Sequence, residues 1–486
     1  MNINYLINAI RILGLLLMPF SATMLPPILV ALWYHENTLN TFLLATSITL
    51  SCGLLLWFPL RRYHREIHAR ETFLIVTVLW IVLSLTGALP FAFADSPHIP
   101  YIDAVFETIS GLTTTGSSVI SHLDNIPRSI LYYRQQLQFI GGGGIIVLSI
   151  AILPMLGVGG MQLFRAEMTG PFKEDKLTPR VAQTAKTLWF IYVGLVIVCA
   201  FSYWLGGMSI FDAICYSFGT ISTGGFSTHD DSFMYFHSPL LETLCTFFML
   251  LGAINFYLHF AALQRKSLLH YWQDPELRTY LYILAFVIIL ITGTLLYKHV
   301  FENSAAAFLK TAFQVISFST TTGFFSTQYN LWPSFIPPLF VVITLLGGCA
   351  GSTSGGFKVI RLLVLKLLGG REIQRLIHPN GHYVIKLGMG QLHHRTLDSI
   401  VGFFCLYVAT YLLLFLLLVA MGLDYSTAFS SIGASIANTG IGIGVQPEPL
   451  ETLSDPVKIV MCFAMLAGRL ELFTFLVLLT PSYWRY

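Results

Sequence analysis

Long apolar stretches separated by short polar ones run the whole length of the chain. Ten of these stretches are long enough for a helix to cross a bilayer, which takes about 20 residues. They cover residues 6–34, 40–60, 72–94, 135–158, 184–206, 238–263, 279–298, 334–368, 397–422 and 456–480. The pattern predicts an all-α integral membrane protein. An even number of spans also places both termini on the same side of the membrane.

Composition points to the same class of protein. Of the 486 residues, 55% are hydrophobic and only 10% are charged, and the mean hydropathy is +0.71. Soluble proteins carry about 25% charged residues. The net charge of +3 gives no reason to expect a nucleic-acid partner. The seven cysteines lie mostly in apolar runs without metal-ligand spacing, so we interpret them as small buried hydrophobic residues.

Basic residues indicate which side of the membrane is cytoplasmic. They concentrate in four predicted loops, at 61–70, 165–180, 265–278 and 361–395. All four loops lie on one face of the predicted topology, and the positive-inside rule makes that face, with both termini, cytoplasmic. The opposite loops are rich in acidic residues, which would concentrate cations at an entrance. Ordinary solvated loops are the simpler interpretation of those acids.

Four of the connections on the opposite face share one pattern. Each starts with a polar residue in a short helix-like run, and a glycine follows thirteen positions later. The four copies are "YIDAVFETISGLTTTGSS" (101–118), "IFDAICYSFGTISTGGFS" (210–227), "FLKTAFQVISFSTTTGFF" (308–325) and "YSTAFSSIGASIANTGIG" (425–442). We therefore predict four tandem repeats of span, short re-entrant helix, polar strand and span. The predicted boundaries are 1–68 for a two-span leader, then 69–178, 179–274, 275–390 and 391–486 for the repeats.

The length of these short helices gives the polar segments a physical role. About ten residues at 1.5 Å each reach only half way through a bilayer, so the chain must return as non-helical backbone. Exposed carbonyls at that depth are tolerated where they line a water-filled path. Four such segments around one axis would form rings of oxygens that replace the hydration shell of a monovalent cation. They predict a selectivity filter, and helix-packing patches of small residues are the alternative.

The stretch at 334–368 is too long for one straight crossing. Thirty-odd helical residues would measure about 50 Å, against a hydrocarbon core of about 30 Å. Its middle, "GGCAGSTSGG" from Gly347 to Gly356, is a poor helix former. We predict a broken helix with a flexible loop below the filter, acting as a gate. A packing kink is the alternative. A phosphate-binding loop is excluded by the membrane context and by the residue after the lysine.

Arg469 stands inside the last apolar stretch, where a charge is costly and usually functional. Glu471 is two positions on and projects from a different helical face, so it cannot pair with Arg469 along the helix. The functional interpretation is a cation barrier beside the gate loop. The alternative is a structural arginine bound to carbonyls of a neighbouring helix.

Four longer motifs resemble those of the membrane subunit of bacterial Trk potassium-uptake systems, in the Trk, Ktr and HKT superfamily of cation transporters. They are "GGFSTHD" (224–230), "ILPMLGVGGMQLFRAEM" (152–168), "GGCAGSTSGGFKVIR" (347–361) and "GRLELFTFLVLLTP" (468–481). The resemblance covers essentially the whole chain, including the leader. It implies four span–pore helix–filter–span repeats around one pore. It also implies a homodimer in the bacterial inner membrane and a cytosolic, TrkA-like regulatory subunit with nucleotide-binding domains.

The resemblance assigns roles to single residues. The filter, which holds the transported potassium ion, would consist of Thr113, Thr114, Thr115, Gly116, Ser222, Thr223, Gly224, Gly225, Thr320, Thr321, Thr322, Gly323, Ala437, Asn438, Thr439 and Gly440. The gate would consist of Gly347, Gly348, Cys349, Ala350, Gly351, Ser352, Thr353, Ser354, Gly355 and Gly356, with Arg469. In plant members, a serine at the position of Gly116 goes with sodium selectivity, so the glycine favours potassium.

Three classes of function remain to be compared. A gated potassium-conducting pore, the transport subunit of an uptake complex, is favoured. A symporter coupling potassium to protons or sodium is the alternative, but the filter segments contain no acid, and midplane carboxylates are expected of such transporters. An enzyme is not expected, because no catalytic constellation, nucleotide motif or bound cofactor is indicated. The loop histidines His378, His382, His393 and His394 are more simply solvated residues than a metal site.

Overall fold

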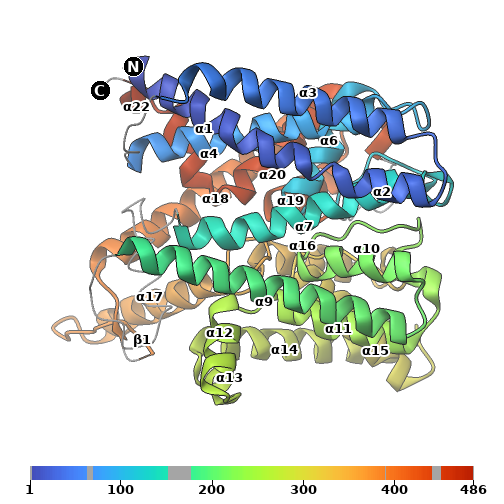
Figure 1. Ribbon diagram of the computed structural model, residues 1–486. Coiled ribbons are helices and arrows are strands. Elements are labelled where there is room, and N and C mark those ends of the chain that lie inside the picture. The colour runs from blue at the N-terminus through green and yellow to red at the C-terminus, as the bar shows by residue number, and fades with distance from the viewer. Residues whose placement is uncertain (1–2, 63–68, 152–176, 389, 441–449, 485–486) are drawn as a thin grey trace.

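The computed structural model describes residues 3–62, 69–151, 177–388, 390–440 and 450–484. The motif at 152–168, the end of the predicted span at 135–158 and residue 68, the predicted end of the leader, lie outside these residues. The described chain is almost entirely helical, and its longer helices run roughly parallel to one another (Figure 1). The predicted fold class, an all-α membrane protein, is confirmed, whereas the exact repeat boundaries stay a prediction.

The leader and the first repeat form one half of the bundle. The leader consists of α1 (Ile3–Ala22), α2 (Leu25–Trp33) and α3 (Leu39–Trp57). The first repeat consists of α4 (Ala69–Gly87), α5 (Leu89–Ala92), α6 (Tyr101–Leu112) and α7 (Arg128–Ala151). Helices α1 and α3 approach closely because Gly14 and Gly53 face each other. A Cβ at Gly14 would lie 2.8 Å from the Gly53 carbonyl oxygen, which is the small-residue packing common between membrane helices.

The other three repeats each contain a long helix, a short helix and an interrupted helix, in that order. The second contains α9 (Leu177–Leu205), α10 (Ile210–Ile221), α11 (Pro239–Ala253), α12 (Phe256–Arg265) and α13 (Leu269–Gln273). The third contains α14 (Pro275–Tyr297), α15 (Ser304–Ser319), α16 (Ile336–Leu346), α17 (Val359–Ile377) and the hairpin of β1 (Lys386–Leu387) with β2 (Gly390–Gln391). The fourth contains α18 (His394–Ala420), α19 (Tyr425–Ala437), α20 (Asp455–Arg469), α21 (Leu472–Leu479) and α22 (Pro481–Trp484). Short 3₁₀ turns cover Phe58–Leu60, Leu123–Asn125, Ser232–Phe236, Tyr329–Leu331 and Leu450–Thr452.

The helices account for the predicted spans with two corrections. Within the described residues, six helices are long and apolar enough to cross a membrane, and two bent pairs raise this number to eight. Helix α7 and the interrupted pair α16–α17 correspond to the remaining two predicted spans. The stretch at 238–263 was predicted as one helical run, but it bends by 95° between α11 and α12. The stretch at 456–480 likewise bends by 116° between α20 and α21.

The hydrophobic core has two large clusters. One draws mainly on the second and third repeats, around Tyr203, Phe233 and Phe340. The other joins the leader to the first and fourth repeats, around Phe42, Tyr133 and Met465. The short helices α10 and α15 contribute to the first cluster, and the short helices α6 and α19 contribute to the second. We call these four the pore helices.

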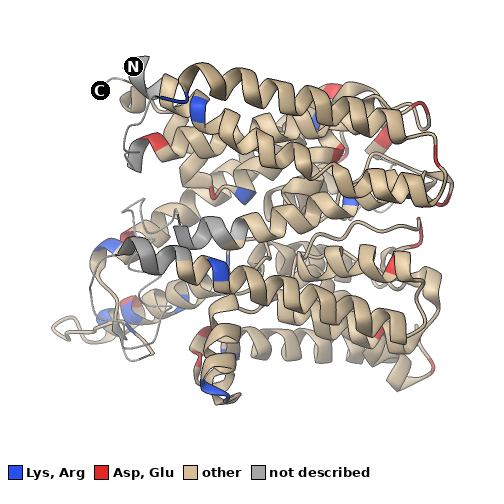
Figure 2. Ribbon diagram, in the orientation of Figure 1, with Lys and Arg blue, Asp and Glu red and all other residues tan. Residues whose placement is uncertain are grey.

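Charge is distributed unequally between the two ends of the bundle (Figure 2). The end that carries α13, α17 and β1 also carries the start of α1 and helix α22 (Figure 1), and many of its charged residues are basic. We call it the basic end. At the opposite end, where the loops before the pore helices lie, acidic residues predominate, and we call it the acidic end.

Candidate functional site: four polar turns and a loop beneath them

The four pore helices end in the same backbone turn. In each repeat, the amide of the residue before the aligned glycine donates to the carbonyl five residues earlier. The pairs are Thr115 with Ser110 (2.8 Å), Gly224 with Gly219 (2.8 Å), Thr322 with Ser317 (2.9 Å) and Thr439 with Ala434 (2.8 Å). This is the Schellman pattern of a helix C-terminus. Its recurrence on the residues aligned from the sequence shows that the four segments share one local structure. We call them the filter segments: 113–116, 222–225, 320–323 and 437–440.

The second residue of every filter segment is left-handed. Thr114, Thr223, Thr321 and Asn438 have φ values of 52°, 52°, 59° and 56°. A β-branched residue rarely adopts this conformation, so the surrounding structure must hold the three threonines in place. Asparagine tolerates it better, which suits the divergent fourth segment.

The glycines mark where neighbouring segments meet. Gly116, Gly225 and Gly323 have φ values of 83°, 79° and 88°, whereas Gly440, the last described residue of its segment, does not have a positive φ. A Cβ on Gly116 would collide with the Gly224 carbonyl oxygen, and one on Gly225 would collide with that of Thr322. A Cβ on Gly440 would meet the backbone of Gly116. These contacts link repeats four, one, two and three in sequence, so the segments converge.

The first and third filter segments contain buried carbonyl oxygens that accept no hydrogen bond from the described residues. Within the described part of the chain, no N–H or hydroxyl donates to the carbonyl oxygens of Thr114, Thr115, Thr321 or Thr322. All four residues are buried, with exposures of 0–1%. Buried carbonyls normally have a hydrogen-bond partner. This group of oxygens at converging helix C-termini is therefore suited to ligating a cation.

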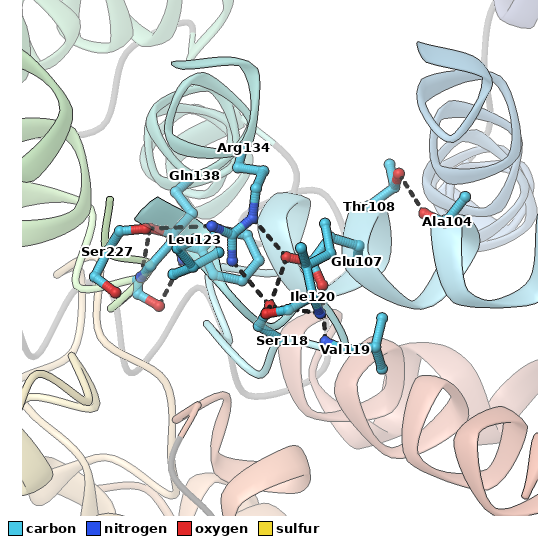
Figure 3. Close-up of polar contacts among 12 residues, drawn as sticks. Ala104, Glu107, Thr108, Ser118, Val119, Ile120, Leu123, Arg134, Gln138 and Ser227 are labelled. Atoms are coloured by element: carbon cyan, nitrogen blue, oxygen red, sulfur yellow. Dashed lines mark hydrogen bonds and ion pairs between the residues drawn. The ribbon is translucent and has the colours of Figure 1, made fainter. Parts of the chain in front are cut away.

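A polar network, which the sequence did not reveal, supports the segments from behind (Figure 3). Arg134 on α7 is 1% exposed, and its Nε lies 2.7 Å from Oε1 of Glu107 on pore helix α6. Gln138, one turn further along α7, donates from Nε2 to the Gly224 carbonyl (2.6 Å) and accepts from the Phe226 amide (3.2 Å). The signal in the sequence was an arginine and several glutamines in an otherwise apolar stretch.

The predicted gate loop joins α16 to α17 directly beneath the filter segments. The Gly355 amide donates to the Thr321 hydroxyl at 2.7 Å, and Thr353 Oγ1 lies 3.3 Å from Thr223 Oγ1. A Cβ on Gly355 would collide with the Ala437 carbonyl oxygen. The loop thus touches three of the four segments, and the prediction that this span is broken is confirmed.

The loop is also held by the bend between α11 and α12. The amides of Cys349 and Thr353 donate to the carbonyls of Ala253 (3.0 Å) and Gly252 (3.3 Å), and the Phe256 amide donates to the Gly351 carbonyl (3.0 Å). Backbone groups freed by the bend are satisfied by the loop, so the two irregular segments depend on each other.

A buried carboxylate holds the loop from the basic end. Glu276, in the first turn of α14, is 3% exposed. Its Oε1 accepts hydrogen bonds from the amides of Ala350 (2.8 Å) and Ile360 (2.9 Å). One side chain therefore contacts both the loop and the first turn of α17.

Arg469 lies at the end of α20, where the last span bends. It is 5% exposed, and its Nη1 donates to the Thr353 carbonyl of the gate loop at 2.9 Å. Its Nε and Nη2 have no hydrogen-bond partner within the described residues. Glu471, with φ of 57°, does not pair with Arg469 but forms an ion pair with Arg361 of α17 at 2.8 Å.

An imidazole bridges two repeats at the acidic end. His229, just beyond the second filter segment, has Nδ1 2.5 Å from Asp124 Oδ1 and Nε2 3.5 Å from Asp212 Oδ1. Partial burial would lower the pKa of His229, but the carboxylates of Asp212 and Asp124 raise it above its usual value. At the other end of the molecule, the four histidines of the 378–394 loop are exposed.

These features define a class: a multi-pass membrane protein with four converging helix-terminal turns and a loop beneath them. Comparisons identify the family. The model of the TrkH family, described as "Cation transport protein", matches residues 38–486. The chain belongs to this family. The family consists of transport proteins, so the prediction that the chain is not an enzyme is confirmed.

Individual relatives are similar over nearly their full length. The Trk system potassium uptake protein TrkH of Vibrio parahaemolyticus is 48% identical over 98% of this chain and 99% of its own. The protein of the same name from Escherichia coli K12 is 47% identical over 98% of both. The crystal structure of the potassium transporter TrkH from Vibrio parahaemolyticus matches with a TM-score of 0.92 and 46% identity, covering 100% of both chains.

Proposed function

We propose that this protein takes up potassium ions through a gated, selective pore, as the translocation subunit of a Trk-type complex. The observation that carries the proposal is the convergence of four helix-terminal turns of the same backbone pattern, two of which contain buried carbonyl oxygens without a donor among the described residues. Relatives of near-equal length are named potassium uptake proteins, which supports potassium as the ion.

In this proposal the filter segments bind the ion and the loop controls its passage. Rings of carbonyls replace the hydration shell of potassium, and the four pore-helix C-termini add negative potential. The segment 347–356 closes the path from the basic end, and Arg469 places a positive charge beside it. The acidic end then faces outward and the basic end, with both termini, faces the cytoplasm of a bacterial inner membrane.

We further propose the assembly that the resemblance implies. The protein would act as a homodimer, and a TrkA-like cytosolic subunit would bind its basic end. The cations of α17 and its neighbours suit either a protein partner or anionic lipid, and they also satisfy the orientation rule.

The test is rubidium uptake into liposomes that carry the purified protein without any proton or sodium gradient. Downhill uptake under these conditions supports a pore. Uptake that strictly requires a proton or sodium gradient would instead support the alternative function, a potassium symporter. The absence of any rubidium or potassium flux under either condition would refute both.

A further inference from the structure

The network in Figure 3 joins the exits of two filter segments through a single side chain. Arg134 Nη2 donates to Ser118 Oγ at 2.9 Å, and Nη1 donates to the Ser227 carbonyl at 3.2 Å. Ser118 follows Gly116 by two positions, and Ser227 follows Gly225 by two positions. The guanidinium therefore contacts equivalent positions of the first and second repeats. It also lies 4.4 Å from the centre of the Phe226 ring.

Glu107 holds this guanidinium in place and also supports its own repeat. Its Oε1 accepts from Arg134 and, at 3.1 Å, from Ser118 Oγ, while its Oε2 accepts from the Val119 amide at 3.0 Å. Glu107 is fully buried. A buried ion pair is tolerated when further hydrogen bonds satisfy both partners, and the contacts of Glu107 and Arg134 meet that condition.

The third repeat provides an internal comparison. Gln314 occupies the position equivalent to Glu107, nine residues before the filter glycine. Its Oε1 accepts from the Ser326 amide at 3.2 Å, the counterpart of the bond between Glu107 and Val119. A neutral amide is thus sufficient to hold the strand that leaves the filter. The negative charge of Glu107 is needed for something more, which is to hold Arg134 where it reaches the second repeat.

We propose that Arg134 sets the spacing of the first and second filter segments and is a specificity-determining positioning residue. This rests on the proposed function, and it adds a residue that touches no ion. A ring of carbonyls discriminates between ions through its size and through the number and field strength of its ligands. Because the Arg134 guanidinium is bonded to both segments, it opposes contraction of the ring around the smaller sodium ion.

The double variant Glu107→Gln, Arg134→Gln tests this directly. It reproduces the neutral arrangement of Gln314, keeps an acceptor for the Val119 amide and leaves no unpaired buried charge, but it removes the bridge to Ser227. In proteoliposomes, we expect the ratio of rubidium to sodium flux to fall about tenfold, the change that about 1.4 kcal/mol produces. Rubidium flux itself should persist.

The matched control removes another ion pair, between a buried lysine and a half-buried aspartate, that contacts no filter segment. Lys458 Nζ lies 2.6 Å from Asp103 Oδ1, and its other hydrogen bond goes to the Glu451 carbonyl. The variant Asp103→Asn, Lys458→Gln should lose thermal stability while keeping the wild-type flux ratio. A double variant at 107 and 134 that also keeps the wild-type ratio, or loses rubidium and sodium flux in parallel, overturns the proposal.

A second measurement tests the proposal even if the double variant does not conduct ions. Ions bound in the filter stabilise the folded protein, so the difference in melting temperature between potassium and sodium solutions reports selectivity without transport. We expect this difference to shrink in the double variant and to persist in the control. If the difference in melting temperature persists in both the double variant and the control, the proposed role of Arg134 is contradicted. A wild-type protein with no preference for rubidium or potassium over sodium would instead refute the proposed function.

Discussion

The amide of Gly355 donates a hydrogen bond to the hydroxyl of Thr321 at 2.7 Å. This contact joins the loop between α16 and α17 to the third filter segment. Thr321 is the left-handed residue of its segment. The equivalent residue of the first segment, Thr114, has a buried hydroxyl without a hydrogen-bond partner among the described residues. The loop therefore contacts the segments unequally, although their backbones are alike.

This inequality predicts different effects for the same substitution at the two positions. Thr321→Val removes the acceptor for Gly355 and should loosen the loop, whereas Thr114→Val removes only a hydroxyl. We expect basal rubidium flux in proteoliposomes to be about fivefold higher for Thr321→Val than for Thr114→Val, since a hydrogen bond contributes about 1 kcal/mol. Equal fluxes would show that this contact does not help to close the pore.

Arg469 should oppose cation passage through its charge. Arg469→Gln keeps a donor for the Thr353 carbonyl but removes the positive charge, and Arg469→Ala removes both. We expect both variants to raise basal rubidium flux by about tenfold, equivalent to about 1.4 kcal/mol. Arg469→Lys is the control that keeps the charge, and its flux should stay near that of the wild type. If only the alanine variant conducts more, the hydrogen bond to the loop matters and the structural interpretation of Arg469 holds.

Gly116 should not accept any side chain. Its φ of 83° and the carbonyl of Gly224 beside it leave no room for a Cβ. Gly116→Ser should therefore reduce the ratio of rubidium to sodium flux by about tenfold or more, as expected for a distorted ring of ligands. Gly194 on α9 is the matched control, because a Cβ there would meet nothing within 4 Å. Gly194→Ser should transport like the wild type, and equal losses in both variants would contradict the assignment of Gly116.

The bridge through His229 predicts a pH dependence of stability. The pKa of His229 is raised in the folded protein. Its contribution to the stability of the fold is therefore fully present below the unfolded pKa of about 6.5, and it is lost as the pH rises through the folded pKa. Burial raises the pKa of Asp212, but the His229 imidazole and the hydroxyls of Ser209 and Thr228 outweigh it and lower the pKa, so the contribution of Asp212 to stability is lost only in acid. We expect the melting temperature to fall from pH 6 to pH 9, and to fall less in His229→Gln. Identical pH profiles would show that the bridge contributes nothing.

The filter segments could be predicted from the sequence because each repeat carries its own copy of one local turn. The spacing from Asp103 to Gly116 recurs in the other repeats, and the Schellman turn that follows needs no distant partner. The unusual length of the 334–368 stretch likewise revealed the break between α16 and α17.

The bends at Ala253 and Arg469 could not be predicted in the same way. Both lie in apolar stretches of ordinary length, and the backbone groups freed at the first bend are satisfied by the gate loop rather than by neighbours in sequence. Asn255, whose Oδ1 accepts from the Tyr257 amide at 2.9 Å, is the one local sign of that bend. The role of Arg134 was hidden for the same reason, since its partners lie in two other segments of the chain.

The proposed function requires that the four filter segments together bind a potassium ion. Anomalous scattering from crystals of the protein in which rubidium replaces potassium measures this binding directly. We expect rubidium on the axis between Gly116, Gly225, Gly323 and Gly440, within carbonyl reach of all four segments. Crystals in which rubidium binds elsewhere, with nothing between these glycines, would contradict the proposed function.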